Sequence, residues 1–337
     1  MTFNAAADSR AVPRPRAAIV GLVLSYGQQL GLVGVIAVLA AVFQAMNPIF
    51  LSPGNIIEML RAGALYFVVA CPSTLVLVAG GLDFSVGALF AAGGIVAGAF
   101  MLGGVPWPVA MAIGVVGGGL LGLINGLVTV YLKVPPLIAT LGMFFAATGF
   151  MNAYTGGSNL FGFPDEFNNI GQGDLLGVPY LVYYGAITGV VFYVLLDKTK
   201  LGYNSRCVGG NRSAASANGI RVDQLDLVVY AISGAVTALA GIFFMARTST
   251  AAPGVGGSNL TFQVVTAIII GGTSLFGGIG TIGGTLLGTL LFAVINNGLA
   301  VINVNALYQN IFIGFILVGA VALDQANRRR QFSSGRK

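Results

Sequence analysis

Asp83 has the most unusual setting in this chain, because it is a carboxylate between two long apolar runs. The pair Gly80-Gly81 precedes it, and Ser85 follows two residues later. Placing a charged side chain at the centre of a bilayer raises the free energy of membrane insertion by about 2.5 to 3.5 kcal/mol. Such a side chain therefore usually faces a protein interior or a water-filled cavity. We predict that Asp83 caps a helix beginning at Phe84 and interacts with its positive end, in preference to binding a solute.

Residues 268–278 repeat this plan of apolar run, glycine pair, polar residue and new apolar run, here with Gly271-Gly272. Unwound backbone at membrane depth is tolerated only where it is buried in protein or lines a cavity. Two interrupted segments in corresponding places of two halves point to a transport pathway. An Asn also follows each break inside a small-residue helix, although a bond between helices explains these Asn residues equally well. The pathway candidates are Asp83, Ser85, Asn125, Thr273, Ser274, Asn296 and Asn297.

The composition excludes a soluble globular protein. Of 337 residues, 56% are hydrophobic and 8% are charged, against about 25% charged residues in ordinary soluble domains. Runs of about 20 apolar residues recur nearly end to end. We therefore predict an all-α polytopic membrane protein with about ten transmembrane helices, some short or broken, in two loosely repeated halves. The expected spans lie near 28–46, 62–80, 84–102, 108–131, 137–154, 179–196, 225–246, 261–274, 281–302 and 308–323.

Glycines recur every fourth residue in two of these spans and indicate close helix packing. One set is Gly118, Gly122 and Gly126, and the other begins at Gly280. Small residues at this spacing let helix backbones approach closely in lipid. We expect packing within the chain in preference to a dimer interface.

The net charge of +6 comes from basic clusters that flank apolar spans. Such clusters set membrane topology, so we expect no nucleic-acid partner. They predict a cytoplasmic N-terminal segment at 1–27, a transmembrane domain at 28–323 with a cytoplasmic loop at 197–226, and a basic cytoplasmic tail at 324–337. The segment 156–179 then lies outside. The absence of histidine excludes histidine proton relays and imidazole metal sites, and we expect no catalytic, cofactor or metal site on this chain.

The cytoplasmic loop predicts a short helix. Asn211 suits a helix N-cap, Ala214 and Ala215 favour helix, and Gly219 suits the C-terminal stop. The pair Gly209-Gly210 is expected to be a flexible lead-in. Such a helix can lie in a partner's groove, and a solvated connector is an equally good interpretation.

Five motifs, in this order, resemble the permease subunit of ribose-type bacterial ABC importers, which take up ribose, xylose, arabinose or galactose. The resemblance covers about Asn55 to Asp324. The motifs are Gly80-Gly81-Leu82-Asp83-Phe84-Ser85-Val86-Gly87, Pro136-Leu137-Ile138-Ala139-Thr140-Leu141-Gly142, Val208-Gly209-Gly210-Asn211 with Ala214-Ala215 and Gly219-Ile220, Gly271-Gly272-Thr273-Ser274-Leu275-Phe276-Gly277-Gly278, and Asn296-Asn297-Gly298-Leu299.

The resemblance implies a multi-pass protein of the bacterial inner membrane with both termini cytoplasmic. Its implied partners are a cytoplasmic ABC ATPase that binds ATP and Mg, an extracytoplasmic sugar-binding protein, a second permease copy or paralogue, and the lipid bilayer. The sequence has no G-x-x-x-x-G-K-[ST] motif of its own, which agrees with ATP binding on a partner. The implied ATPase-coupling residues are Gly209, Gly210, Asn211, Ala214, Ala215 and Gly219.

The chain departs from the family pattern where Thr148 replaces an Arg and where Thr261 and Gln263 replace a Glu and an Asp. The solute within the sugar and polyol class therefore stays open. Two alternatives remain: an ABC permease for a nucleoside or a branched amino acid, and an ion-coupled secondary transporter that uses Asp83. A third alternative, a membrane-embedded enzyme, is disfavoured because the sequence shows no set of nucleophile, base and orienting group.

Overall fold

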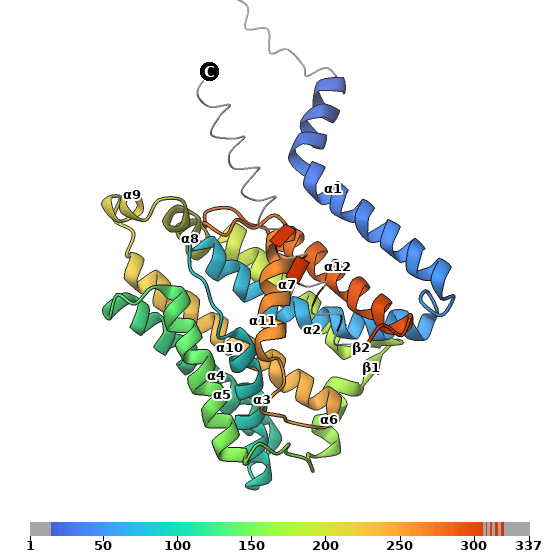
Figure 1. Ribbon diagram of the computed structural model, residues 1–337. Helices are drawn as coiled ribbons and strands as arrows, with labels where there is room; N and C mark the ends of the chain where they lie inside the picture. The colour runs from blue at the N-terminus through green and yellow to red at the C-terminus, as the bar shows by residue number, and fades with distance from the viewer. Residues whose placement is uncertain (1–14, 306–307, 309–310, 312–313, 316–317, 320–337) are drawn as a thin grey trace, which may run out of the picture.

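The computed structural model describes residues 15–305 together with 308, 311, 314–315 and 318–319, and this part is almost entirely helical (Figure 1). Two short strands, β1 (Asp174–Leu175) and β2 (Val178–Pro179), pair antiparallel with Asp174 opposite Pro179. The helices are α1 (Pro15–Met46), α2 (Pro53–Val78), α3 (Val86–Leu102), α4 (Trp107–Tyr131), α5 (Pro136–Thr155), α6 (Asp165–Gln172), α7 (Tyr180–Lys198), α8 (Lys200–Gly210), α9 (Arg212–Ala217), α10 (Val222–Thr248), α11 (Gly257–Ile270) and α12 (Ile282–Val301).

Seven of these helices are long and apolar enough to cross a membrane: α1, α2, α4, α5, α7, α10 and α12. The apolar helices α3 and α11 are shorter and correspond to the third and eighth expected spans. The tenth span, 308–323, and the tail, 324–337, fall largely or wholly outside the described residues, as do residues 1–14. The polytopic helical fold is confirmed, while the count of ten is not. In addition, α1 begins at Pro15, inside the segment expected to precede the first span.

The core is built where α3, α4 and α10 pack backbone to backbone. A Cβ added to Gly118 would lie 2.2 Å from the Ala238 Cβ and 2.6 Å from the Gly234 carbonyl oxygen. One added to Gly122 would lie 2.2 Å from the Tyr230 carbonyl oxygen. The second glycine set behaves alike, since Gly288 of α12 lies directly against α11. Both sets therefore serve packing within the chain, as predicted.

Two groups of short elements lie at opposite ends of α10 (Figure 1). The helices α8 and α9 directly precede α10 in the chain and lie near its N-terminal end. The helix α6 packs at the last turn of α10, where Gly171 lies against the Arg247 backbone. Because α10 has 27 residues, the two ends are about 40 Å apart. The 156–179 loop is also bound to 247–260, through a bridge between Leu160 and Ala251 and a bond from Gln172 Nε2 to Ser249 Oγ of 2.9 Å. These two segments form one surface.

Replacing Gly118 by Val tests the core packing. The added methyl groups would meet Ala238 and Gly234, and overpacking of this kind costs about 1 to 3 kcal/mol. We expect a clearly lower Tm of the detergent-purified protein in a thermal unfolding assay. Gly117→Val is the matched control, because its added Cβ would have only Val96 nearby, at 3.8 Å. Equal Tm values for the two variants would contradict this packing.

Candidate functional site

The first break, residues 79–85 between α2 and α3, turns on a left-handed glycine. Gly80 has φ +82°, a conformation that glycine adopts without steric cost. The Gly80 N–H donates to the Leu77 carbonyl (2.8 Å) and the Gly81 N–H to the Val76 carbonyl (2.9 Å). This pair of bonds is the Schellman ending of a helix, so α2 stops here.

Asp83 is the buried centre of this break, with 3% of its surface exposed. Its Oδ1 accepts from the Ser85 N–H (3.0 Å) and from Ser85 Oγ (2.5 Å), and its Oδ2 accepts from Ser233 Oγ of α10 (3.3 Å). Asn125 of α4 donates to Ser85 Oγ over 2.9 Å. Within the described residues no cationic side chain pairs with Asp83. Its bonds therefore come from hydroxyl and amide groups.

The prediction that Asp83 caps a helix beginning at Phe84 is wrong in its details. The helix begins at Val86, and Asp83 binds the N–H of Ser85, the residue before the first turn. The N–H of Gly87, inside the first turn, donates instead to Thr261 Oγ1 of α11 over 2.9 Å. The cap is supplied by another helix, so no local pattern could show it.

Two more side chains, from α5 and α10, hold the break by its backbone. Thr140 Oγ1 of α5 accepts from the Phe84 N–H (3.0 Å), and the Tyr230 hydroxyl of α10 donates to the Leu82 carbonyl (3.2 Å). Thr140, Tyr230, Ser233 and Thr261 were not among the predicted site residues. Tyr230 and Ser233 show in the sequence only as polar groups inside an apolar span, whereas Thr140 lies in the second family motif and Thr261 is a departure from the family pattern.

The second break, between α11 and α12, begins with the same geometry. Gly272 has φ +95°, its N–H donates to the Ile269 carbonyl (2.9 Å), and the Thr273 N–H donates to the Ile268 carbonyl (3.1 Å). The two helix endings therefore match bond for bond, although a repeat of whole halves is not established. Thr273 Oγ1 is buried without a hydrogen-bond partner among the described atoms, and Ser274 Oγ accepts from the Phe276 N–H over 3.3 Å.

The two breaks meet each other and α8 at a cluster that we name the glycine junction: Gly80, Gly209, Gly277 and Gly278. A Cβ added to Gly277 would lie 2.8 Å from the Cα atoms of both Gly80 and Gly209. The Gly278 N–H donates to the Val78 carbonyl over 2.9 Å. The prediction of a flexible lead-in at Gly209-Gly210 is wrong: both residues end α8, and Gly209 is needed for close approach of three backbones.

The short helix α9 has the predicted caps. Asn211 Oδ1 accepts from the Ala214 N–H over 2.9 Å, and Gly219 stops the helix with φ +83°. Ala215 is 5% exposed and packs in the core, whereas Ala214 is exposed. The Ala214 side of α9 is therefore open to a partner.

The two asparagines of α12 lie apart from Asp83. Asn297 and Asn55 of α2 exchange two amide bonds of 2.8 and 2.9 Å. Asn296 Nδ2 donates to Gln263 Oε1 of α11 over 3.4 Å. Both side chains tie helices together, and their role in a pathway stays a prediction.

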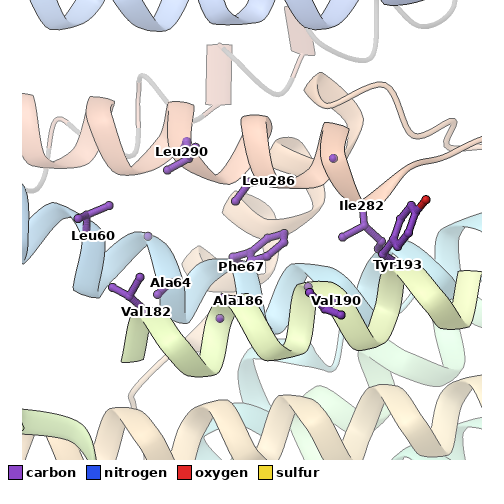
Figure 2. Close-up of a pocket in the computed structure, with 14 residues that line it drawn as sticks. Leu60, Ala64, Phe67, Val182, Ala186, Val190, Tyr193, Ile282, Leu286 and Leu290 are labelled. Carbon is purple, nitrogen blue, oxygen red and sulfur yellow. The ribbon is translucent and has the colours of Figure 1, made fainter. Parts of the chain in front are cut away.

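A cavity of about 440 Å³ between α2, α7 and α12 has an apolar lining (Figure 2). Phe67, Val190 and Leu286 are among the side chains around it, and Gly185 and Gly189 widen it. A hydroxylated solute would find few hydrogen-bond partners here, so this cavity is not the candidate solute site.

Comparison with known proteins identifies one family. A family described as "Branched-chain amino acid transport system / permease component" matches residues 55–321. The chain is 35% identical to the ribose import permease protein RbsC of Bacillus subtilis over 90% of its own length and 94% of the relative's. It is 34% identical to the D-allose transport system permease protein AlsC of Escherichia coli, covering 86% and 90% of the two chains. It is 33% identical to the L-arabinose ABC transporter permease protein AraH of Azospirillum brasilense, covering 96% of each. No solved structure matches the chain.

Substitutions at Asp83 test its place in the break. Asp83→Leu leaves three donors, on Ser85 and Ser233, without their acceptor, and each buried unsatisfied group costs about 1 to 3 kcal/mol. Asp83→Asn keeps one acceptor oxygen, and its amide can donate to Ser233 Oγ. We expect Asp83→Asn to reach the membrane folded with a modestly lower Tm, and Asp83→Leu to be largely lost. Loss of both variants to the same extent, measured by membrane yield and Tm, would refute this account.

Proposed function

The chain belongs to the ABC importer permease family described as a branched-chain amino acid transport system permease component, and we propose that it is the membrane-spanning subunit of an ATP-driven importer for a monosaccharide or related polyol. The names of the relatives given above include ribose, D-allose and L-arabinose. Sugars are neutral and polyhydroxylated, so hydroxyl and amide groups such as those at the two breaks suffice to bind them. The chain itself is a transport subunit, not an enzyme.

The observation that carries this proposal is the glycine junction. It joins α8, which leads into the coupling helix α9, to both breaks through direct backbone contacts. Closely packed backbones cannot slide independently, because packed interiors have no free volume to absorb the movement. A shift of α8 therefore moves both breaks together.

The expected partners follow from the family. Two cytoplasmic ATPase subunits bind ATP and Mg and contact the exposed Ala214 side of α9, with Asn211 and Gly219 setting the ends of that helix. An extracytoplasmic sugar-binding protein docks on the surface formed by 156–179 and 247–260. A second permease copy or a paralogue completes the assembly in the bacterial inner membrane, with both termini cytoplasmic.

The mechanism is alternating access. ATP binding closes the ATPase pair and displaces α9 and α8, and the glycine junction passes this displacement to the breaks at Gly80 and Gly277. The pathway then opens between the interrupted elements, past Ser85, Asn125, Thr273 and Ser274. In this scheme Asp83 holds the first break together. The ion-coupled alternative instead requires Asp83 to exchange a proton or sodium ion. Solute uptake that persists in Asp83→Asn supports the ATP-driven mechanism, and loss of uptake from a folded Asp83→Asn protein supports the ion-coupled one.

Bulk on the exposed face of α9 tests the ATPase contact. Ala214→Trp adds a large side chain where the partner is expected, without entering the core as a change at Ala215 would. We expect the ATPase that co-purifies with the tagged chain from native membranes in mild detergent to be lost, together with ATPase activity in the eluate. Ser158→Trp is the control, because Ser158 is exposed in the 156–179 loop at the other end of the molecule. Retention of the ATPase by Ala214→Trp, or its absence from the unmodified protein, would contradict the coupling assignment.

A methyl group in the glycine junction tests the transmission step. In Gly209→Ala the new Cβ would lie 2.0 Å from the Val78 carbonyl oxygen and 2.5 Å from the Gly278 nitrogen. We expect the ATPase to stay bound while sugar uptake and its coupling to ATP hydrolysis fall at least about tenfold, the equivalent of 1.4 kcal/mol. The neighbouring Gly210→Ala is a close control, since nothing lies within 4 Å of its added Cβ. Normal coupling in Gly209→Ala would show that the junction does not transmit motion.

A further inference from the structure

A second cavity, of about 220 Å³, lies between α2, α3, α10 and α11 and differs in chemistry from the apolar cavity of Figure 2. Four polar side chains line it: Tyr66, Arg247, Asn259 and Gln263. Two aromatic rings, Phe90 and Phe244, form part of its wall with centroids 5.6 Å apart. A mostly apolar pocket with a few convergent polar groups is the usual form of a small-molecule site.

The polar groups of this cavity are available to a neutral solute. Gln263 accepts from Asn296 through Oε1, which leaves its Nε2 free to donate to a ligand. Asn259 is exposed and makes no side-chain hydrogen bond to another described residue. Arg247 is paired with Glu58 over 2.9 Å, so its charge is compensated. The site therefore offers amide and hydroxyl groups without a free charge that would select an ionic solute.

The start of α3, directly beyond the Asp83 break, lies next to Gly256 in the wall of this cavity. A Cβ added to Gly256 would lie 2.7 Å from the Gly87 carbonyl oxygen and 3.2 Å from the Phe90 ring. Thr261, which accepts from the Gly87 N–H, lies one turn further along α11 than Gly257. The cavity thus lies on the side of the break away from α8 and α9, next to the surface formed by 156–179 and 247–260.

The first turn of α11 adds donors to the same cavity. No side chain caps this helix at Gly256, and both Gly256 and Asn259 line the cavity. The first N–H groups of a helix have no partner within the helix, so they are free to donate to a solute oxygen. These backbone donors add to the hydrogen bonds that the polar side chains offer, and the proposed site depends on the side chains first.

We propose that this cavity is a binding site for one monosaccharide-sized neutral polyol, where the solute waits beside the closed Asp83 break before translocation. Asn259 and Gln263 bind its hydroxyl groups, and Phe90 and Phe244 contact its C–H faces. The cavity volume is that of roughly seven water molecules in the liquid. The cavity therefore accommodates one small solute and not an oligosaccharide. The assignment rests on the function proposed above and adds to it the place and chemistry of a solute site.

Thiol protection in the full chain, reconstituted in lipid, tests the site. We would introduce Asn259→Cys together with Cys207→Ser, since Cys207 is the accessible native cysteine and Cys71 is buried. The rate of modification by a charged methanethiosulfonate is then measured with D-ribose, D-allose, L-arabinose or D-galactose. At least one sugar should slow the reaction about threefold once its concentration reaches twice its Kd. Adding Gln263→Leu should raise the concentration needed about tenfold, as expected for one lost hydrogen bond.

Ser258→Cys is the matched control, because Ser258 is the adjacent exposed residue and does not line the cavity. Equal protection at both positions, or protection by leucine and by none of the sugars, would overturn the proposal. Uptake of the same sugars by cells that contain the whole importer keeps the two proposals apart. Uptake without protection contradicts the cavity alone, whereas protection without uptake supports the cavity and contradicts the importer.

Discussion

The close backbone contact of two helix breaks with α8 is the constraint on which the rest of the structure depends. Three segments meet at the glycine junction, and a Cβ added to Gly209 or Gly277 would lie within 2.0 to 2.8 Å of another backbone. This contact requires α2 and α11 to end where they do, since each helix must stop to bring its glycine to the junction. It also places α9, through α8, in mechanical contact with the membrane-spanning part of the molecule.

A second requirement is that the polar groups of the break at Asp83 find hydrogen-bond partners. Buried polar groups without hydrogen bonds are costly in a low-dielectric interior, and four helices supply bonds to the break at Asp83. Two departures from the family pattern have a place in this scheme. Thr261 supplies an uncharged cap to α3, and Gln263 joins Asn296 to the polar cavity. Nothing in the structure explains Thr148.

The two cavities share only α2 and differ in chemistry. The one between α2, α7 and α12 is apolar and suits hydrocarbon, whereas the one between α2, α3, α10 and α11 carries amides, a phenol and a compensated ion pair. They lie on different faces of α2. This helix therefore separates an apolar environment from the proposed solute site.

Composition and motif order were enough to predict a polytopic helical permease, because hydrocarbon tolerates only helices with internally bonded backbones and those helices need long apolar runs. Local patterns were also enough for the caps at Asn211 and Gly219, since a cap bonds within its own turn. Capping of α3, the bonds to Asp83 and the close backbone packing of Gly209 depended on tertiary structure. The four helices that bind the break at Asp83 do so through bonds between groups 40 to 174 residues apart. Only folding decides which distant helix brings a hydroxyl, an amide or a bare backbone to that place.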